Sequence, residues 1–196
     1  MGAKYHLRNQ ELRAITLDIG YTTTSISVVQ IEATGEVNVE EYGISMKGGR
    51  DVDRAIADHC VAKFNEQHGT NFDKSTQDCK ELYKALEGEC ERAKKQLQQS
   101  AEVTIRRESF YDEKDLEVTL TQDQLKELCE EFLSQLNEAT DRALKEAYLE
   151  LDDAHEEEFE VLLVGGSTRL LLVREWVKEK FNKAPDTSVP PEEVIA

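Results

Sequence analysis

The stretch VLLVGGSTRLLLV, residues 161–173, is the part of the sequence that indicates the fold most clearly. An apolar run ends at two adjacent glycines, Gly165 and Gly166, and Ser167, Thr168 and Arg169 follow before a second apolar segment. Glycines at the end of a strand let a ligand's phosphates or sugar approach the main chain closely. A tight turn between a strand and a helix would have the same sequence, so the pattern alone leaves both interpretations open.

A second apolar run ends in a similar way, in the stretch LDIGYTTTS at residues 17–25. It offers Asp18, Gly20, Thr22 and Thr23 as candidate contacts for phosphate or for metal-bound water, because main-chain N–H groups at such a turn can hold phosphate oxygens. Neither loop matches GxxxxGKS/T or GxGxxG, the two common phosphate-binding patterns. Each loop is therefore a weak signal by itself.

Hydrophobic periodicity predicts a mixture of strands and helices. The predicted strands are residues 12–20, 25–31 and 37–44 in an antiparallel meander, a hairpin around YDEK at 111–114, and residues 159–166. The predicted helices are residues 51–67, 75–99, 121–149 and 170–181, with one more starting near residue 191. Asp51 is the expected cap of the first helix, and Thr121 with Gln124 forms a capping box. Residues 152–160 are predicted to be a solvated acidic connector.

The composition is that of a soluble globular chain. Its 196 residues carry a net charge of −17, which argues against a protein that binds a nucleic-acid backbone. No apolar run reaches the roughly 20 residues of a membrane helix, and the N-terminus lacks the apolar core of a signal peptide. The cysteines form no CxxC pair, which favours free thiols in a reducing, cytoplasmic compartment and no metal site.

The segment CERAKKQLQ at residues 90–98 places an acid, two lysines and an amide on one side of a predicted helix. At about 100° per residue, Glu91, Lys94, Lys95 and Gln98 cluster away from the apolar stripe. This group can bind a polar ligand, or it can be a solvated face with charge pairs four residues apart. The spacing alone favours the solvated face.

Taken in order, these motifs resemble the second lobe of the ATPase domain of the seventy-kilodalton heat-shock chaperones, the DnaK type, within the actin-like ATPase superfamily. The motifs are the D-x-G-x-x-T turn at Asp18, GGRDVD at residues 48–53, CERAKKQL at 90–97, LTQDQLKELCEEFL at 120–133, VLLVGGSTR at 161–169 and PPEEVIA at 190–196. The resemblance covers nearly the whole chain. No single motif is decisive, but their order and spacing are specific.

The resemblance implies that the GGSTR turn lies against bound ATP or ADP, which carries Mg²⁺ in an intact domain of the family. Gly165, Gly166 and Ser167 would line the phosphate and ribose side, and Arg169 would pack on the adenine. Under this resemblance, the ligand that approaches the main chain at the glycine pair would be a nucleotide.

The resemblance also assigns the helix face of CERAKKQLQ to the adenosine side. Glu91 and Lys94 would meet the ribose hydroxyls. Lys95 stands where the family usually has an arginine over the base, and Gln98 replaces a serine beside the adenine edge. Glu192 stands where the family often has an aspartate near the nucleotide. Lysine cannot stack on a base as the planar guanidinium of arginine does.

The second phosphate loop departs from the family pattern. That loop usually reads D-L-G-G-G-T-F-D, whereas this chain has DIGYTTTS at residues 18–25. Tyr21 and Thr22 replace glycines, which obstructs close approach of phosphate to the main chain. Ser25 replaces an acid that helps to organise metal-bound water, and Arg50 stands where an acid is usual.

We therefore expect an α/β chain, an actin-like ATPase half-domain of ribonuclease-H-like fold. Residues 10–50 and 121–196 would form this subdomain, and residues 51–120 a smaller inserted α/β subdomain. The expected function is that of a lobe of a chaperone ATPase domain, serving protein folding in the stress response, that binds the adenosine side of ATP or ADP. Hydrolysis by this chain alone is not expected, because the resemblance places the first phosphate loop in a first lobe that this sequence does not contain.

The expected partners are nucleotide, co-chaperones or nucleotide-exchange factors, and the first lobe, but not nucleic acid or a membrane. A second hypothesis is a non-catalytic interaction module that docks a co-chaperone or exchange factor. The altered loop at residues 18–25 favours this module, whereas the helix face and the GGSTR turn favour nucleotide binding.

Overall fold

The computed structural model describes residues 12–34, 36–149 and 159–185, and contacts divide the chain into two compact units. Unit 1 comprises the residues up to Gly49 and those from Phe132 onward, and unit 2 is the continuous segment Arg50–Glu131. Residues 121–131 therefore group with unit 2, whereas the sequence assigned them to the larger subdomain. The subdomain boundaries at residues 51 and 120 remain a prediction.

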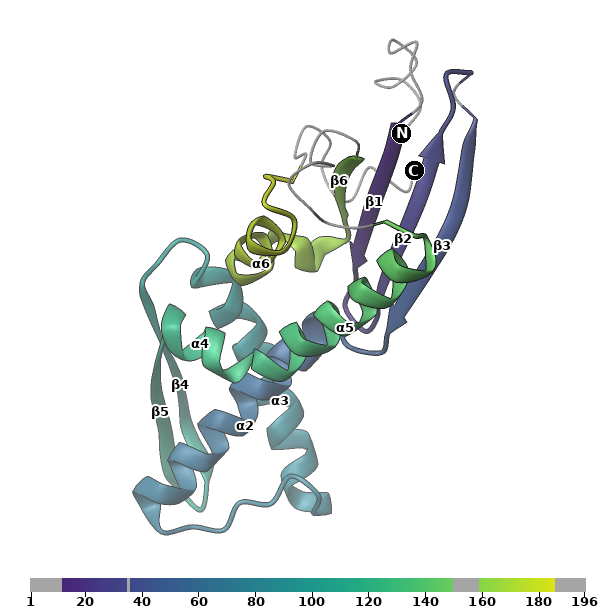
Figure 1. Ribbon diagram of the computed structural model, residues 1–196. Coiled ribbons are helices and arrows are strands. Elements are labelled where there is room, and N and C mark those ends of the chain that lie inside the picture. The colour runs from purple at the N-terminus through teal and green to yellow at the C-terminus, as the bar shows by residue number, and fades with distance from the viewer. Residues whose placement is uncertain (1–11, 35, 150–158, 186–196) are drawn as a thin grey trace. The chain divides into compact units, whose positions relative to one another are not determined.

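Unit 1 is built on a four-stranded mixed sheet with the strand order β3-β2-β1-β6 (Figure 1). β1 (Leu12–Ile19), β2 (Thr24–Ile31) and β3 (Val37–Ser45) form an antiparallel meander, so this prediction is confirmed. β6 (Phe159–Val164) lies parallel to β1 on its other side. Because β2 runs in the opposite direction, β1, β3 and β6 all end at the same edge of the sheet.

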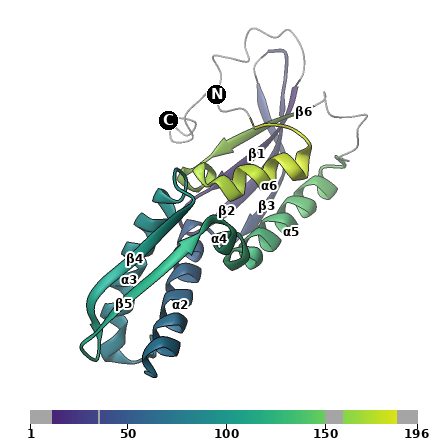
Figure 2. The same ribbon diagram turned by 90° about the vertical axis from the view of Figure 1, so that its left-hand side faces the viewer.

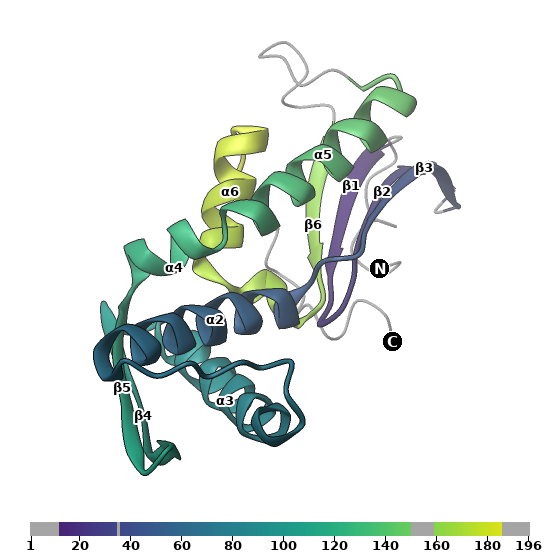
Figure 3. The same cartoon turned by 90° about the horizontal axis from the view of Figure 1, so that it is seen from below.

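Two helices cover one face of this sheet (Figure 3); they are α5 (Glu130–Glu146), which belongs to unit 1 from Phe132 onward, and α6 (Leu171–Phe181). The missing side chain of Gly43 lets α5 approach β3, because a Cβ there would lie 2.4 Å from the carbonyl oxygen of Ala139. Phe159 of β6 packs against Phe181 of α6, with ring centroids 6.3 Å apart. The strand register places Gly43 and Phe159 on the same face, so both helices pack there.

Unit 2 packs a β-hairpin along a pair of helices (Figure 2). Its elements are α2 (Gly49–His68), α3 (Gln77–Gln96), β4 (Glu102–Tyr111), β5 (Lys114–Thr121) and α4 (Gln122–Leu128). Phe64 of α2 and Phe72 both pack on Phe110 of β4, with ring centroids 5.1 and 4.9 Å apart. The hairpin predicted at YDEK is confirmed, and Asp112 and Glu113 both have the positive φ of a type I′ turn.

The helix predicted from Thr121 to residue 149 is in fact two helices. The chain leaves helical geometry at Cys129, where φ is −99° and ψ is 7°, and α5 starts at the next residue. The capping box is confirmed, since the Gln124 N–H donates to the Thr121 hydroxyl and the Thr121 N–H donates to the Gln124 side chain. Periodicity continues across the break, which is why the sequence indicated one helix.

Other predictions differ in smaller ways. Asp51 does not cap α2, because that helix already begins at Gly49 and places the Asp51 carboxylate in its first turn. The helix predicted near residue 191 lies outside the described residues, and so does all but the end of the predicted acidic connector.

The prediction of free thiols is confirmed, since every cysteine is buried and none forms a disulfide; they are Cys60, Cys79, Cys90 and Cys129. Among the described helices, none has the length and apolar character needed to cross a membrane.

Candidate functional site

Three loops of unit 1 meet at the edge of the sheet where β1, β3 and β6 end. They are residues 20–23 after β1, 46–49 after β3 and 165–169 after β6. In open α/β sheets, ligands bind outside the carboxyl ends of the strands. Both glycine-containing loops singled out in the sequence therefore lie at one edge, although residues 24–164 separate them along the chain.

The carbonyl oxygen of Gly20 joins these three loops. It accepts a hydrogen bond from the Ser167 hydroxyl at 2.9 Å and another from the Gly49 N–H at 3.0 Å. The Gly20 N–H donates to the carbonyl of Thr23 at 2.9 Å, which closes the first loop on itself. Ser167 thus holds the site together, in addition to any contact with a ligand.

Gly48 and Gly165 leave no room for a side chain, whereas Gly166 does. A Cβ on Gly48 would lie 2.7 Å from the carbonyl oxygen of Tyr21, and one on Gly165 would lie 2.5 Å from that of Ile19. Gly165 also has φ of +83°, a conformation that strains any residue with a side chain. A Cβ on Gly166 would meet no other atom within 4 Å. Packing requires the first glycine of the pair, and the second leaves the main chain open to a ligand.

The polar groups of the loop after β1 differ in their exposure. Tyr21, Thr22 and Thr23 are exposed, and Asp18, near the end of β1, is half-buried. Burial raises the pKa of the Asp18 carboxyl group. Its Oδ1 lies beside the GG turn, 2.7 Å from where a Cβ of Gly165 would stand. Within the described part of the chain, no three His, Cys, Asp or Glu side chains are grouped to hold a metal ion.

The GG turn continues as a single 3-10 turn, η1 (Gly166–Arg169). The Thr168 hydroxyl donates to the carbonyl of Gly165 at 2.7 Å and fixes this turn from inside. Arg169, at its end, is exposed to solvent. Glu192, the remaining candidate near the nucleotide, lies outside the described residues.

The second group of candidate residues lies on α3 in unit 2. Lys95 and Glu91 form an exposed ion pair four residues apart, with Nζ 2.7 Å from Oε1. The hydrogen bond from Lys95 lowers the pKa of Glu91. Gln98 donates from its side chain to the carbonyl of Lys94 at 2.7 Å. The ion pair between Lys95 and Glu91 is the kind of charge pair that the solvated-face interpretation predicted.

Lys94 does not lie on the solvated face, and this part of the sequence interpretation was wrong. Its side chain is 7% exposed, and its ammonium group lies 2.7 Å from Oδ1 of Asp53, which is 1% exposed. Burial raises the pKa of Asp53, against the hydrogen bond and the charge of Lys94, which lower it. Because a buried charge needs a partner, Lys94 serves first as the counter-ion of Asp53. A contact between Lys94 and ribose remains a prediction.

Sequence reasoning missed two residues that build these regions. Asp53 falls in the apolar stripe of α2 with Ala57 and Cys60, and an acid at such a position signals a buried partner. Thr24 is 1% exposed, and its hydroxyl donates to the carbonyl of Lys47 at 2.9 Å, which ties the start of β2 to the loop after β3. Nothing in the run of threonines distinguishes this one.

The fold defines a mixed α/β protein whose loops gather at the carboxyl ends of its strands. The chain belongs to the Hsp70 protein family, whose model matches residues 3–196. It is 29% identical over 187 residues to a heat shock 70 kDa protein of Emericella nidulans and 30% identical over 188 residues to heat shock 70 kDa protein 2 of Paracoccidioides lutzii.

It is also 27% identical over 190 residues to heat shock cognate 70 kDa protein 3 of Dictyostelium discoideum. These matches cover 95–96% of the chain but only 27–29% of each relative. The chain therefore spans less than a third of the length of each of these three relatives.

Proposed function

We propose that this chain is a lobe of a molecular-chaperone ATPase domain and that it binds the adenosine side of ATP or ADP. The observation that carries the proposal is the meeting of the GGSTR turn with the loops after β1 and β3, with open space beside Gly166. A phosphate or ribose can approach the main chain there without displacing a side chain. The Hsp70 family binds ATP and ADP together with Mg²⁺.

The phosphate-side residues fit a nucleotide in part. The exposed hydroxyls of Thr22 and Thr23 lie at the same edge as the open space beside Gly166. Tyr21, however, stands where the family usually has a glycine, and its side chain obstructs the approach of phosphate to the main chain of this loop. We infer that phosphate contributes little here and that the GGSTR turn is the more important loop.

The adenosine-side residues fit unequally as well. Glu91 and Lys95 lie at the surface of α3, where their hydrogen-bonding groups can be exchanged for those of ribose. Lys94 would first have to leave a buried carboxylate, which is costly. The expected affinity is therefore weak and depends on Glu91 and on Arg169 more than on Lys94.

The second candidate function is a non-catalytic module that docks a co-chaperone or nucleotide-exchange factor. The commitment of Lys94 to Asp53 favours it, and so does the exposed Tyr21 in the loop after β1. In this case the GG turn serves only to pack β1 against β6, and nucleotide is not needed.

Calorimetric titration with ATP, ADP and adenosine separates the two functions. Nucleotide binding predicts saturable heat with all three ligands, weaker binding after Arg169→Ala and after Glu91→Ala, and little change after Thr22→Ala. Arg169 would contribute packing as well as charge. If Thr22→Ala abolished binding while Arg169→Ala left it intact, the loop after β1 would be the true phosphate site. No heat with any nucleotide would favour the docking module.

We also propose that the chain alone does not turn over ATP. Phosphoryl transfer needs charge stabilisation and a positioned water around the γ-phosphate, and the family resemblance assigns most of those groups to the other lobe. Steady-state phosphate release should stay at the level of a no-enzyme control. Turnover comparable to that of an intact ATPase domain of the family would contradict this.

A further inference from the structure

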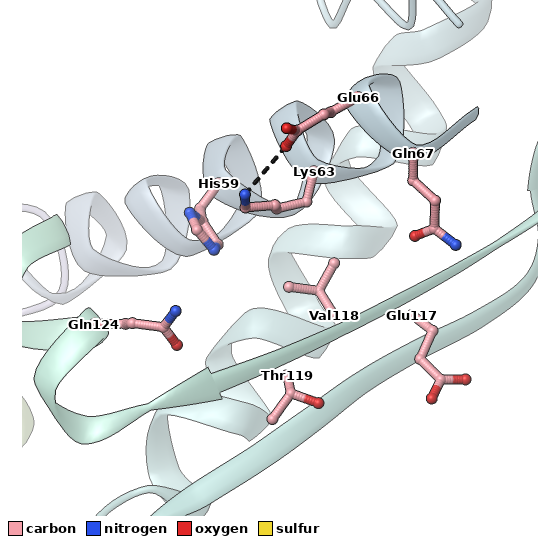
Figure 4. Close-up of a pocket in the computed structure, with 8 residues that line it drawn as sticks. All are labelled: His59, Lys63, Glu66, Gln67, Glu117, Val118, Thr119 and Gln124. Atoms are coloured by element: carbon pink, nitrogen blue, oxygen red, sulfur yellow. Dashed lines mark hydrogen bonds and ion pairs between the residues drawn. The ribbon is translucent and has the colours of Figure 1, made fainter. Parts of the chain in front are cut away.

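A groove in unit 2 lies between α2 and the free edge of the β4–β5 hairpin (Figure 4). It has a volume of about 260 Å³. One wall is formed by side chains of α2, the other by three consecutive residues of β5, and one end by α4; the lining residues are His59, Lys63, Glu66, Gln67, Glu117, Val118, Thr119 and Gln124. His59 and Gln67 point from the helix toward the strand (Figure 4).

The main chain of β5 presents hydrogen-bonding groups to this groove. Among the described residues, β5 pairs only with β4, so its other edge has no strand beside it. His68 at the end of α2 donates to the carbonyl of Asp115 at 3.0 Å, which shows that Asp115 faces α2 and not β4. Main-chain groups two residues apart point to the same edge of a strand. Those of Glu117 and Thr119 therefore face the groove.

The charges that line the groove are already neutralised. Lys63 pairs with Glu66 on α2 at 3.1 Å, and Glu117 pairs with Arg106 on β4 at 3.0 Å. Burial, followed by the charge of Lys63, lowers the pKa of His59, so its imidazole is neutral at pH 7. Because each charge is paired in this way, the groove offers no net charge to attract a charged ligand, which favours an uncharged one.

We propose that this groove binds a short, extended, uncharged segment of a partner polypeptide, which pairs with β5 as a third strand of the hairpin. The unpaired edge supplies main-chain hydrogen bonds in the manner of β-augmentation. The volume is below the roughly 300–1,000 Å³ of typical small-molecule sites, which argues against a drug-sized ligand. The proposal does not depend on nucleotide binding, because all of its residues lie within unit 2.

The test uses a heptapeptide of alternating threonine and valine with both termini capped, titrated into the ¹⁵N-labelled full chain. Binding at the groove should shift the amide signals of Glu117 and Thr119 and slow their hydrogen exchange. A peptide of the same sequence with alternate amides N-methylated should bind at least about tenfold more weakly, because it has lost donors to the edge. Absence of binding at millimolar peptide, or shifts centred on α3, would overturn the proposal.

Thr119→Pro and Thr119→Ala form a matched pair of variants. Proline removes the N–H that faces the groove and leaves the ladder with β4 intact, as proline does at an edge, whereas alanine keeps this N–H. We expect Thr119→Pro to weaken peptide binding by about tenfold and Thr119→Ala by less than about twofold. Glu117→Pro and Glu117→Ala repeat the comparison at the same edge if Thr119→Pro does not fold. Equal affinity of the proline and alanine variants would overturn the proposal.

Discussion

The two groups of predicted nucleotide contacts are built from different parts of the polypeptide. In unit 1 the loops are joined at one main-chain atom, the carbonyl oxygen of Gly20, and packed through Gly48 and Gly165, where there is no room for a side chain. In unit 2 the contacts are side chains of one helix, and the most buried of them, Lys94, is held by Asp53. The stability of the loops in unit 1 should therefore be sensitive to side-chain volume, and that of the helix face in unit 2 to changes of charge.

The largest effect is expected for Asp53→Asn, because it leaves the Lys94 ammonium group buried without an anion. Removing one partner of a buried pair costs about 3–5 kcal/mol. Amide hydrogen exchange of α2 and α3, measured in urea, should show this cost as a lower free energy of unfolding of unit 2. Glu66→Gln on the same helix is the control, since the pair of Glu66 with Lys63 is exposed; we expect less than about 1 kcal/mol there.

The double variant Asp53→Leu with Lys94→Met sharpens this test. Replacing both ions by apolar residues removes the unpaired charge, and such exchanges are often neutral. We expect most of the lost stability to return. If the double variant were as unstable as Asp53→Asn, the cost would come from packing and not from charge.

Gly165→Ala should be next in size, and its cause is steric. A Cβ would press on the carbonyl of Ile19, and the backbone angle is already unfavourable for alanine. We expect a loss of about 1–3 kcal/mol, measured by the fluorescence of Trp176, the only tryptophan, which lies in unit 1. Gly166→Ala is the matched control and should change stability by less than about 0.5 kcal/mol. If Gly165→Ala and Gly166→Ala reduced stability equally, the room for a Cβ would not be what distinguishes the two glycines.

Ser167→Ala removes the hydroxyl that donates to the Gly20 carbonyl at 2.9 Å. One such hydrogen bond contributes about 1 kcal/mol, and the Gly49 N–H still satisfies the same oxygen. The midpoint of urea unfolding followed by Trp176 should therefore fall slightly. A loss larger than that of Gly165→Ala would show that the hydroxyl, and not the glycine, is the main support of the loops.

The smallest effect concerns pH. Burial lowers the pKa of His59 below its usual 6.5, so the unfolded chain takes up the proton more readily than the folded one. The stability contributed by neutral His59 is present above pH 6.5 and is lost as the pH falls below it. In His59→Gln the decrease in urea midpoint between pH 7.5 and 5.5 should be smaller than in the parent chain. If the urea midpoint decreased equally in His59→Gln and in the parent chain, the decrease would come from groups other than His59.

Much of the fold could be predicted because local signals agree with it. The apolar runs of β1 and β6, the capping box at Thr121 and the YDEK turn each act over a few residues, and each is found in the structure. The break at Cys129 was not predictable, because the apolar periodicity continues through it. The burial of Lys94 was missed for a related reason. Periodicity places a side chain on a face, but it does not show that a carboxylate from another helix is buried beside it.

The hydrogen bond between Ser167 and Gly20 also has a consequence for the order of folding. The two residues are 147 positions apart, and the loop cluster cannot form until the strand that precedes Ser167 has been made and placed beside β1. Unit 2 is one continuous segment and contains its own hairpin and helix pair. Contacts that are close in sequence form sooner than distant ones, and during synthesis the chain emerges from its N-terminus. The groove of unit 2 should therefore be complete before the loops of unit 1 close around Gly20.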